Sequence, residues 1–78
     1  MITIIERTAE GYAFFGMDED GERWELGSAT ERIQDEGTED EYRYFSGYFD
    51  TQKIEFDDAE HAARIIKKRD HNREIEIR

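Results

Sequence analysis

The chain has 78 residues, with 21 acidic and 11 basic side chains and a formal net charge of −10 at pH 7. A chain of this length builds one small core, so we expect residues 1–78 to form a single domain. The absence of cysteine excludes disulfides and thiolate metal sites. Although 41% of residues are charged, ten aromatic residues and nine isoleucines supply enough apolar surface for a folded domain.

Charge and hydropathy also limit which kinds of partner are possible. No stretch approaches the roughly 20 apolar residues of a membrane-spanning helix. A net charge of −10 repels both nucleic acid and anionic membranes, because both carry phosphate. We therefore expect no membrane contact, no direct nucleic-acid binding, no cofactor and a basic protein surface as the natural partner. The protein itself is expected to be a monomer or a small homo-oligomer.

The first half of the chain predicts strands. Ile2 and Ile4 alternate with polar residues, as in an edge or second-layer strand. Residues 12–17 are apolar on both faces, which is typical of a central strand covered on each side.

A tight hairpin is predicted next. Asp20-Gly21 is a turn signal, because glycine tolerates the positive φ that such turns require. On the returning strand Trp24 and Leu26 share a face, and we expect both to enter the core.

The segment after this hairpin allows two interpretations. Ser28 followed three residues later by Glu31 matches a capping box, and Gly37 would end a short helix over residues 29–36. Only two residues of that helix are apolar, so an ordered loop is the alternative.

A second hairpin is predicted from the aromatic segment 42–49. Ser46-Gly47 interrupts this segment, either as a bulge within one strand or as a turn that splits it. After a polar turn at residues 50–52, Ile54 and Phe56 alternate with polar residues in a returning strand.

The clearest helix spans about residues 57–70. Asp57 is expected to cap it, with Glu60 completing a capping box, and the cations at its end suit the helix dipole. Its apolar stripe has the spacing of a helix packed on a sheet: Ala59, Ala62, Ala63, Ile65 and Ile66. A last short strand follows, in which Ile75 and Ile77 alternate with charged residues.

The assembled elements predict an α+β domain. We expect a mostly antiparallel sheet of four to six strands, packed against one main helix. The order of the strands does not follow from the sequence.

The charge is concentrated in one span, residues 18–41. This span holds 11 carboxylates and two arginines, so its net charge is 2 − 11 = −9, nearly the whole imbalance of the chain. Same-face residues of a strand repeat at about 6.6 to 6.8 Å, close to two steps of a nucleic-acid strand at about 3.4 Å each. Carboxylates on strands can therefore imitate a run of phosphates, whereas the plainer interpretation is a solvated acidic face.

The sequence contains no complete catalytic or metal-binding motif. Residues 18–21 resemble the middle of an EF-hand loop, but this alignment places Gly16 and Gly27 where ligands are required. His61 lies one helical turn beyond Asp57, and two side chains are too few for a metal site. With no catalytic motif in the chain, we expect neither an enzyme nor a metal centre.

The chain resembles small acidic inhibitors encoded by phages and mobile elements, notably anti-CRISPR and anti-restriction proteins. The resemblance rests on size, the lack of cysteine and the clusters DEDGE at 18–22 and DEGTEDE at 35–41. It implies a protein that occupies the nucleic-acid-binding or PAM-reading surface of a defence effector. A cytoplasmic location is expected, in the host cytosol if the chain is phage-encoded.

The leading hypothesis is a non-catalytic inhibitor that engages a basic surface of a protein or nucleoprotein complex that normally holds nucleic acid. The alternative is an antitoxin-like or other interaction module that binds a basic partner without imitating nucleic acid. In both cases the predicted contact residues are Asp18, Glu19, Asp20, Glu22, Glu25, Asp35, Glu36, Glu39, Asp40, Glu41, Tyr42 and Tyr44. Tyrosine beside carboxylate suits arginine-rich surfaces, through cation–π contact and charge-assisted hydrogen bonds.

Overall fold

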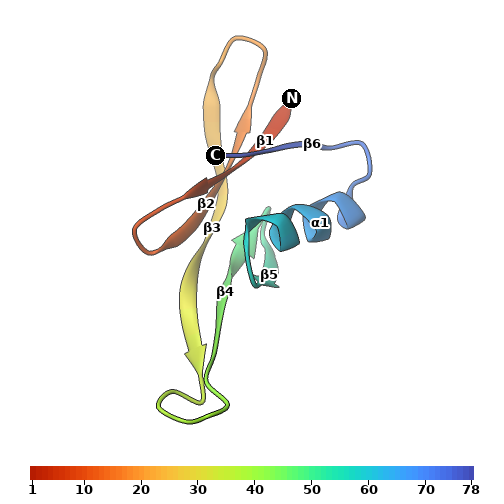
Figure 1. The fold of residues 1–78 in the computed structure, drawn as a ribbon. Coiled ribbons are helices and arrows are strands. Elements are labelled where there is room, and N and C mark those ends of the chain that lie inside the picture. Colours follow the sequence, from red (N-terminus) through yellow and green to blue (C-terminus); the bar gives the residue numbers. More distant parts are fainter.

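The computed structural model describes all of residues 1–78. Six strands and one helix follow each other along the chain (Figure 1): β1 Ile2–Arg7, β2 Gly11–Met17, β3 Arg23–Gln34, β4 Tyr42–Phe49, β5 Gln52–Phe56, α1 Ala59–Arg69 and β6 Glu74–Ile77. The strands form one sheet in the order β5-β4-β3-β2-β1-β6. Only the β1–β6 pair is parallel. The domain is therefore α+β as predicted, with the sheet as its dominant part.

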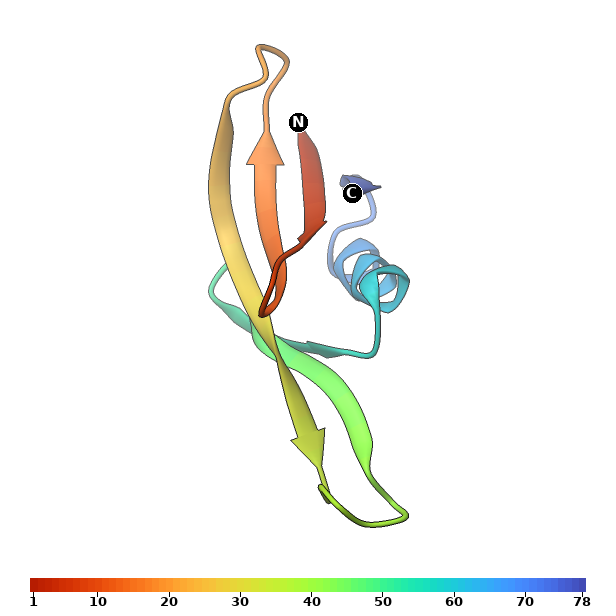
Figure 2. The same cartoon turned by 60° about the vertical axis from the view of Figure 1, so that its left-hand side comes forward.

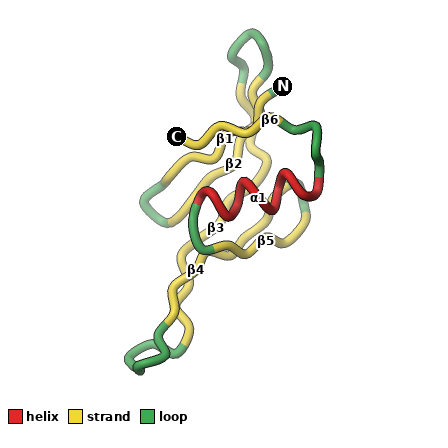
Figure 3. The backbone as a smooth tube through the Cα atoms, turned by 45° about the vertical axis from the view of Figure 1, so that its right-hand side comes forward, coloured by secondary structure: helices red, strands yellow, loops and turns green.

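Helix α1 lies across the concave face of the curled sheet (Figures 2 and 3) and connects the two edge strands β5 and β6. Its predicted apolar stripe is confirmed, because Ala62 and Ile66 are fully buried. They join a core of nine side chains, of which the sheet supplies Ile5, Phe14, Ala29, Phe45, Phe49, Ile54 and Phe56. Edge-to-face packing of Phe14 with Phe49 and Phe56 fills its centre. The single helix is too short and too polar to cross a membrane.

The predicted helix over residues 29–36 is wrong, and so is the loop alternative for most of that range. Residues 29–34 continue strand β3, which runs unbroken for 12 residues. Ser28 to Thr30 pair with β2 on one side and β4 on the other, and Ala29 is buried. Hydrogen bonding to a strand on each side stabilises the extended conformation more than a capping box stabilises a helix that has no apolar face to bury.

Strand β1 is not an edge or second-layer strand. It lies between β2 and β6, because the last strand returns parallel to it. Both Ile4 and Ile5 are fully buried, which explains why their apolar side chains are adjacent rather than alternating. The interior position predicted for residues 12–17 is confirmed, although its second face is only partly covered.

Trp24 does not enter the core. It pairs with Gly16 near the tip of the β2–β3 hairpin and stays 41% exposed. A Cβ on Gly16 would come within 2.5 Å of the indole ring, so the ring packs over the bare glycine backbone. Leu26 does reach the core, and it is the extra residue of a bulge where the β2–β3 register shifts.

Ser46-Gly47 forms neither a bulge nor a turn. The β3–β4 register is continuous from Gln34–Tyr42 to Gly27–Phe49, and β4 is one strand. A Cβ on Gly47 would overlap the Ser28 carbonyl oxygen. This glycine therefore permits close approach of two backbones rather than a change of direction.

The N-cap of the helix lies one residue later than predicted. Asp58, not Asp57, is the N-cap, and its carboxylate accepts a hydrogen bond from the His61 N–H at 2.8 Å. This shift puts His61 rather than Glu60 at the third helical position, so no capping box forms.

We expect Asp58→Ala to lower the free energy of unfolding by about 1 kcal/mol, the usual cost of losing an N-cap side chain. Asp57→Ala is the matched control and should cost only a few tenths of a kcal/mol, the size of an exposed charge–dipole term. Urea denaturation of both variants measures the difference. Equal losses would contradict the assignment of the cap.

Candidate functional site

The two acidic clusters lie at opposite ends of the molecule. The loop 18–22 tips the β2–β3 hairpin and the loop 35–41 tips the β3–β4 hairpin (Figures 1 and 2), and the chain measures 48 Å along its longest axis. Charges in water at physiological salt are screened beyond about 8 Å. The two loops are therefore independent electrostatic sites, and the acidic span is not one surface.

Their carboxylates also do not form a strand-spaced row. Of the ten predicted contact carboxylates, only Glu25 lies within a strand. The other nine lie in the two loops: Asp18, Glu19, Asp20, Glu22, Asp35, Glu36, Glu39, Asp40 and Glu41. The spacing argument for phosphate imitation thus does not apply to them, and any imitation would have to come from the shape of each loop.

In the first loop, Asp18 has a structural role. Its Oδ1 accepts hydrogen bonds from the N–H groups of Asp20 at 3.0 Å and Glu22 at 2.9 Å, while Gly21 takes the positive φ of 84° that the turn needs. The predicted Asp-Gly turn is confirmed. The carboxylates that remain free of such bonds here are those of Glu19, Asp20 and Glu22.

The second loop is organised around Thr38. The Thr38 hydroxyl donates to the Asp35 carbonyl at 2.7 Å and accepts the Asp40 N–H at 3.2 Å. The backbone N–H groups of Thr38 and Glu41 close two successive turns. This loop holds five carboxylates and no cation, so Thr38 keeps like charges close together at the tip.

A two-stranded arm carries this second loop. Residues 32–34 of β3 pair only with residues 42–44 of β4. At the inner end of the arm the Glu31 N–H still donates to the Glu10 carbonyl at 3.0 Å. Arg43 lies 3.2 Å from Glu31 and 4.0 Å from Glu41. Glu41 is the only acid of the loop with an ion-pair partner. The four others, Asp35, Glu36, Glu39 and Asp40, form no ion pair within the chain.

Tyr42 and Tyr44 lie along the arm, Tyr42 in the strand pair next to the loop and Tyr44 two residues further in. Their rings are stacked, with centroids 5.9 Å apart and an interplanar angle of 15°, and Tyr42 is 48% exposed. The structure thus brings both predicted tyrosines to the loop 35–41, and far from the loop 18–22.

A cavity of about 220 Å³ lies beside these tyrosines. It forms where β5 ends and the helix begins, between Gln34, Tyr42 and Tyr44 of the arm and Glu55, Phe56, Asp57 and His61. The last four were not among the predicted contact residues. The sequence does hold a signal for two of them, Glu55 and Asp57. A turn at residues 50–51 pairs Ser46 with Glu55, and the same register continued two residues further places Asp57 opposite Tyr44.

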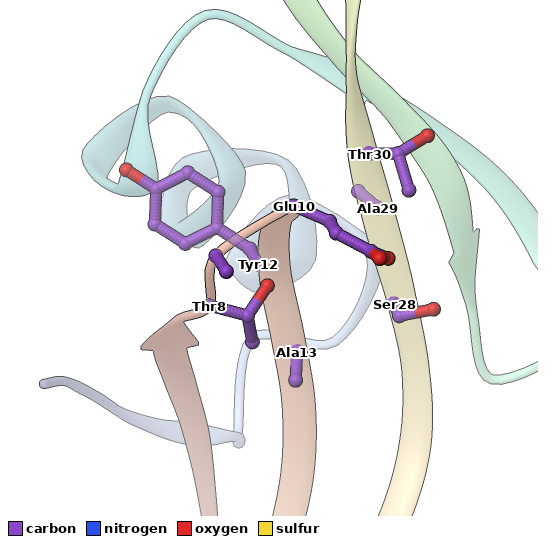
Figure 4. Close-up of a pocket in the computed structure, with 8 residues that line it drawn as sticks. Thr8, Glu10, Tyr12, Ala13, Ser28, Ala29 and Thr30 are labelled. Carbon is purple, nitrogen blue, oxygen red and sulfur yellow. The ribbon is translucent and has the colours of Figure 1, made fainter.

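A second cavity, of about 320 Å³, lies between the β1–β2 turn and β3. Figure 4 shows its side chains, which include the hydroxyls of Thr8, Ser28 and Thr30 and the carboxylate of Glu10. The Thr8 hydroxyl accepts the Gly11 N–H at 3.1 Å. No histidine, lysine or arginine lines this cavity, and Glu10 is its one ionised side chain at neutral pH. No group of three or more His, Asp or Glu side chains in the chain is placed to hold a metal ion.

Comparison with known proteins gives no relative: no family model, no curated protein and no solved structure matches this chain.

We expect Thr38→Val to disorganise the acidic tip while leaving the sheet intact, because valine keeps the shape and loses both hydroxyl hydrogen bonds. The cost should be about 1 to 2 kcal/mol in unfolding free energy, the usual worth of one or two neutral hydrogen bonds. Amide chemical shifts should change within residues 35–41 and not in β1 or β6. Unchanged shifts in the loop would show that Thr38 does not organise it.

Proposed function

We propose that the protein is a non-catalytic inhibitor that inserts the tip of its β3–β4 arm into a basic protein surface that normally holds nucleic acid. One observation carries this proposal: five carboxylates at the end of a projecting two-stranded arm, four of them without an internal cation. Charge that serves only solubility is expected to be spread over the surface with both signs interspersed, rather than concentrated at the end of an arm.

The physics of such a contact is electrostatic. A groove lined by lysine and arginine focuses positive potential, and an acidic tip is steered into it at rates that fall with added salt. Inhibition then follows from occupancy, because the arm and the phosphates of a nucleic acid compete for the same cations. The nucleic-acid-binding or PAM-reading surfaces of defence effectors, which the resemblance implies, are surfaces of this kind.

The alternative is an interaction module that binds a basic partner without imitating nucleic acid. The separation of the two acidic ends favours it, since no continuous row of carboxylates follows the molecule. The two proposals share the arm and differ in one property. Only an inhibitor of the first kind is displaced from its partner by nucleic acid.

The test begins with an immobilised wild-type chain and extract from cells rich in nucleic-acid-processing complexes, washed at increasing salt. A tip-neutral variant, with Asp35→Asn, Glu36→Gln, Glu39→Gln, Asp40→Asn and Glu41→Gln, should lose the retained protein. The matched control neutralises the other end through Glu19→Gln, Asp20→Asn and Glu22→Gln and should keep it. All eight side chains are exposed, so thermal melting of both variants should match the wild type.

With the retained protein purified, we expect the tip-neutral variant to bind at least tenfold more weakly, because each exposed ion pair contributes up to about 1 kcal/mol. Titration of nucleic acid into the wild-type complex should release the chain. Equal affinity of the tip-neutral variant would refute both proposals. Failure of nucleic acid to compete would leave the interaction module and remove the inhibitor.

A further inference from the structure

The cavity between the arm and the start of helix α1 combines three kinds of group. Two stacked tyrosine rings form one side, the carboxylates of Glu55 and Asp57 lie at its rim, and Phe56 contributes apolar surface. Its volume of about 220 Å³ suits one long side chain rather than a drug-sized ligand, whose sites start at about 300 Å³.

Both carboxylates are free of strong internal partners. Glu55 has only Lys53, at 3.3 Å, and both side chains are about half exposed or more, so this surface pair is worth little. Asp57 Oδ2 lies 3.6 Å from His61 Nδ1, which resembles an ion pair. However, the backbone N–H of Asp57 donates to that same nitrogen at 3.0 Å. Nδ1 is therefore an acceptor and carries no proton to give to the carboxylate.

We propose that this cavity binds an arginine side chain of the partner and gives the arm a preference for arginine over lysine. The inference rests on the proposed function, since it names the residue that the arm recognises beside its tip. A guanidinium is planar and weakly hydrated, so it stacks flat on a tyrosine ring. Its fork of N–H donors reaches two carboxylates at once. An ammonium group is a compact, strongly hydrated charge, and gains less from the same cavity.

The test compares arginine-only and lysine-only peptides of equal length and charge, each titrated into the wild-type chain at the same ionic strength. We expect the arginine peptide to bind about fivefold more tightly, the factor that corresponds to roughly 1 kcal/mol of cation–π contact at a partly exposed site. Amide shifts on titration should include those of Tyr42, Tyr44 and His61. Equal affinities for the two peptides, or binding of neither, would overturn the proposal without any variant being made.

Variants then locate the preference. Tyr42→Ala with Tyr44→Ala should remove it by weakening the arginine peptide about fivefold, while Tyr42→Phe with Tyr44→Phe should retain it. Tyr48→Ala is the matched control, because Tyr48 lies on the same strand, is 59% exposed and does not line the cavity. A loss of preference in Tyr48→Ala equal to that in the double alanine variant would refute the assignment.

The carboxylates are tested in the same way. Glu55→Gln and Asp57→Asn should each reduce the arginine preference, whereas Glu60→Gln, which removes the same charge from a neighbouring exposed position outside the cavity, should not. The tip-neutral variant should weaken both peptides in parallel and keep their ratio. If neutralising the tip weakens both peptides but the wild-type chain shows no preference for arginine, this inference alone is refuted. If the arginine preference is observed but neutralising the tip changes neither affinity, the proposed function alone is refuted.

Discussion

The contact between helix α1 and the concave face of the sheet governs the rest of this fold. Ala62 and Ile66 pack against phenylalanines from β2, β4 and β5, and the small alanine side chain lets the helix approach closely. Because the helix connects the two edge strands, its length and position bring β6 to the far side of β1. A sheet of six strands with few fully buried residues has no other layer to hold its curvature.

Strand β3 gives the molecule its elongated shape. Its first residues pair only with β2, its last residues pair only with β4, and residues 27–30 pair with both. Gly27, at φ 155° beside the bulge, could not carry a Cβ without overlapping the Tyr48 carbonyl oxygen. This crowded crossing lets one strand serve two hairpins that point in opposite directions. The acidic loops 18–22 and 35–41, which only this strand separates in the sequence, therefore lie at opposite ends of the domain.

Local signals predicted most of the fold. The turns at Asp20-Gly21 and residues 50–52, and the apolar stripe of the helix, each depend on a few neighbouring residues. The predictions that were wrong concern segments whose structure depends on pairing with distant strands. Ser28 and Glu31 have the spacing of a capping box, but their segment is a strand because β2 and β4 pair with it. Strand β1 is interior because β6 pairs with it. For the candidate site, the sequence identified the charged and aromatic residues. It could not divide them between two ends, nor bring His61 to Tyr42, because both steps need the arrangement of strands and helix in space.

Placing the two acidic loops at opposite ends also determines what a bound chain presents to solvent. With the arm tip in a basic groove, as proposed, the loop 18–22 lies at the far end of the molecule, where Glu19, Asp20 and Glu22 stay exposed. The positive surface of the groove is then covered by a body of negative net charge, and this charge repels the phosphates of any further nucleic acid.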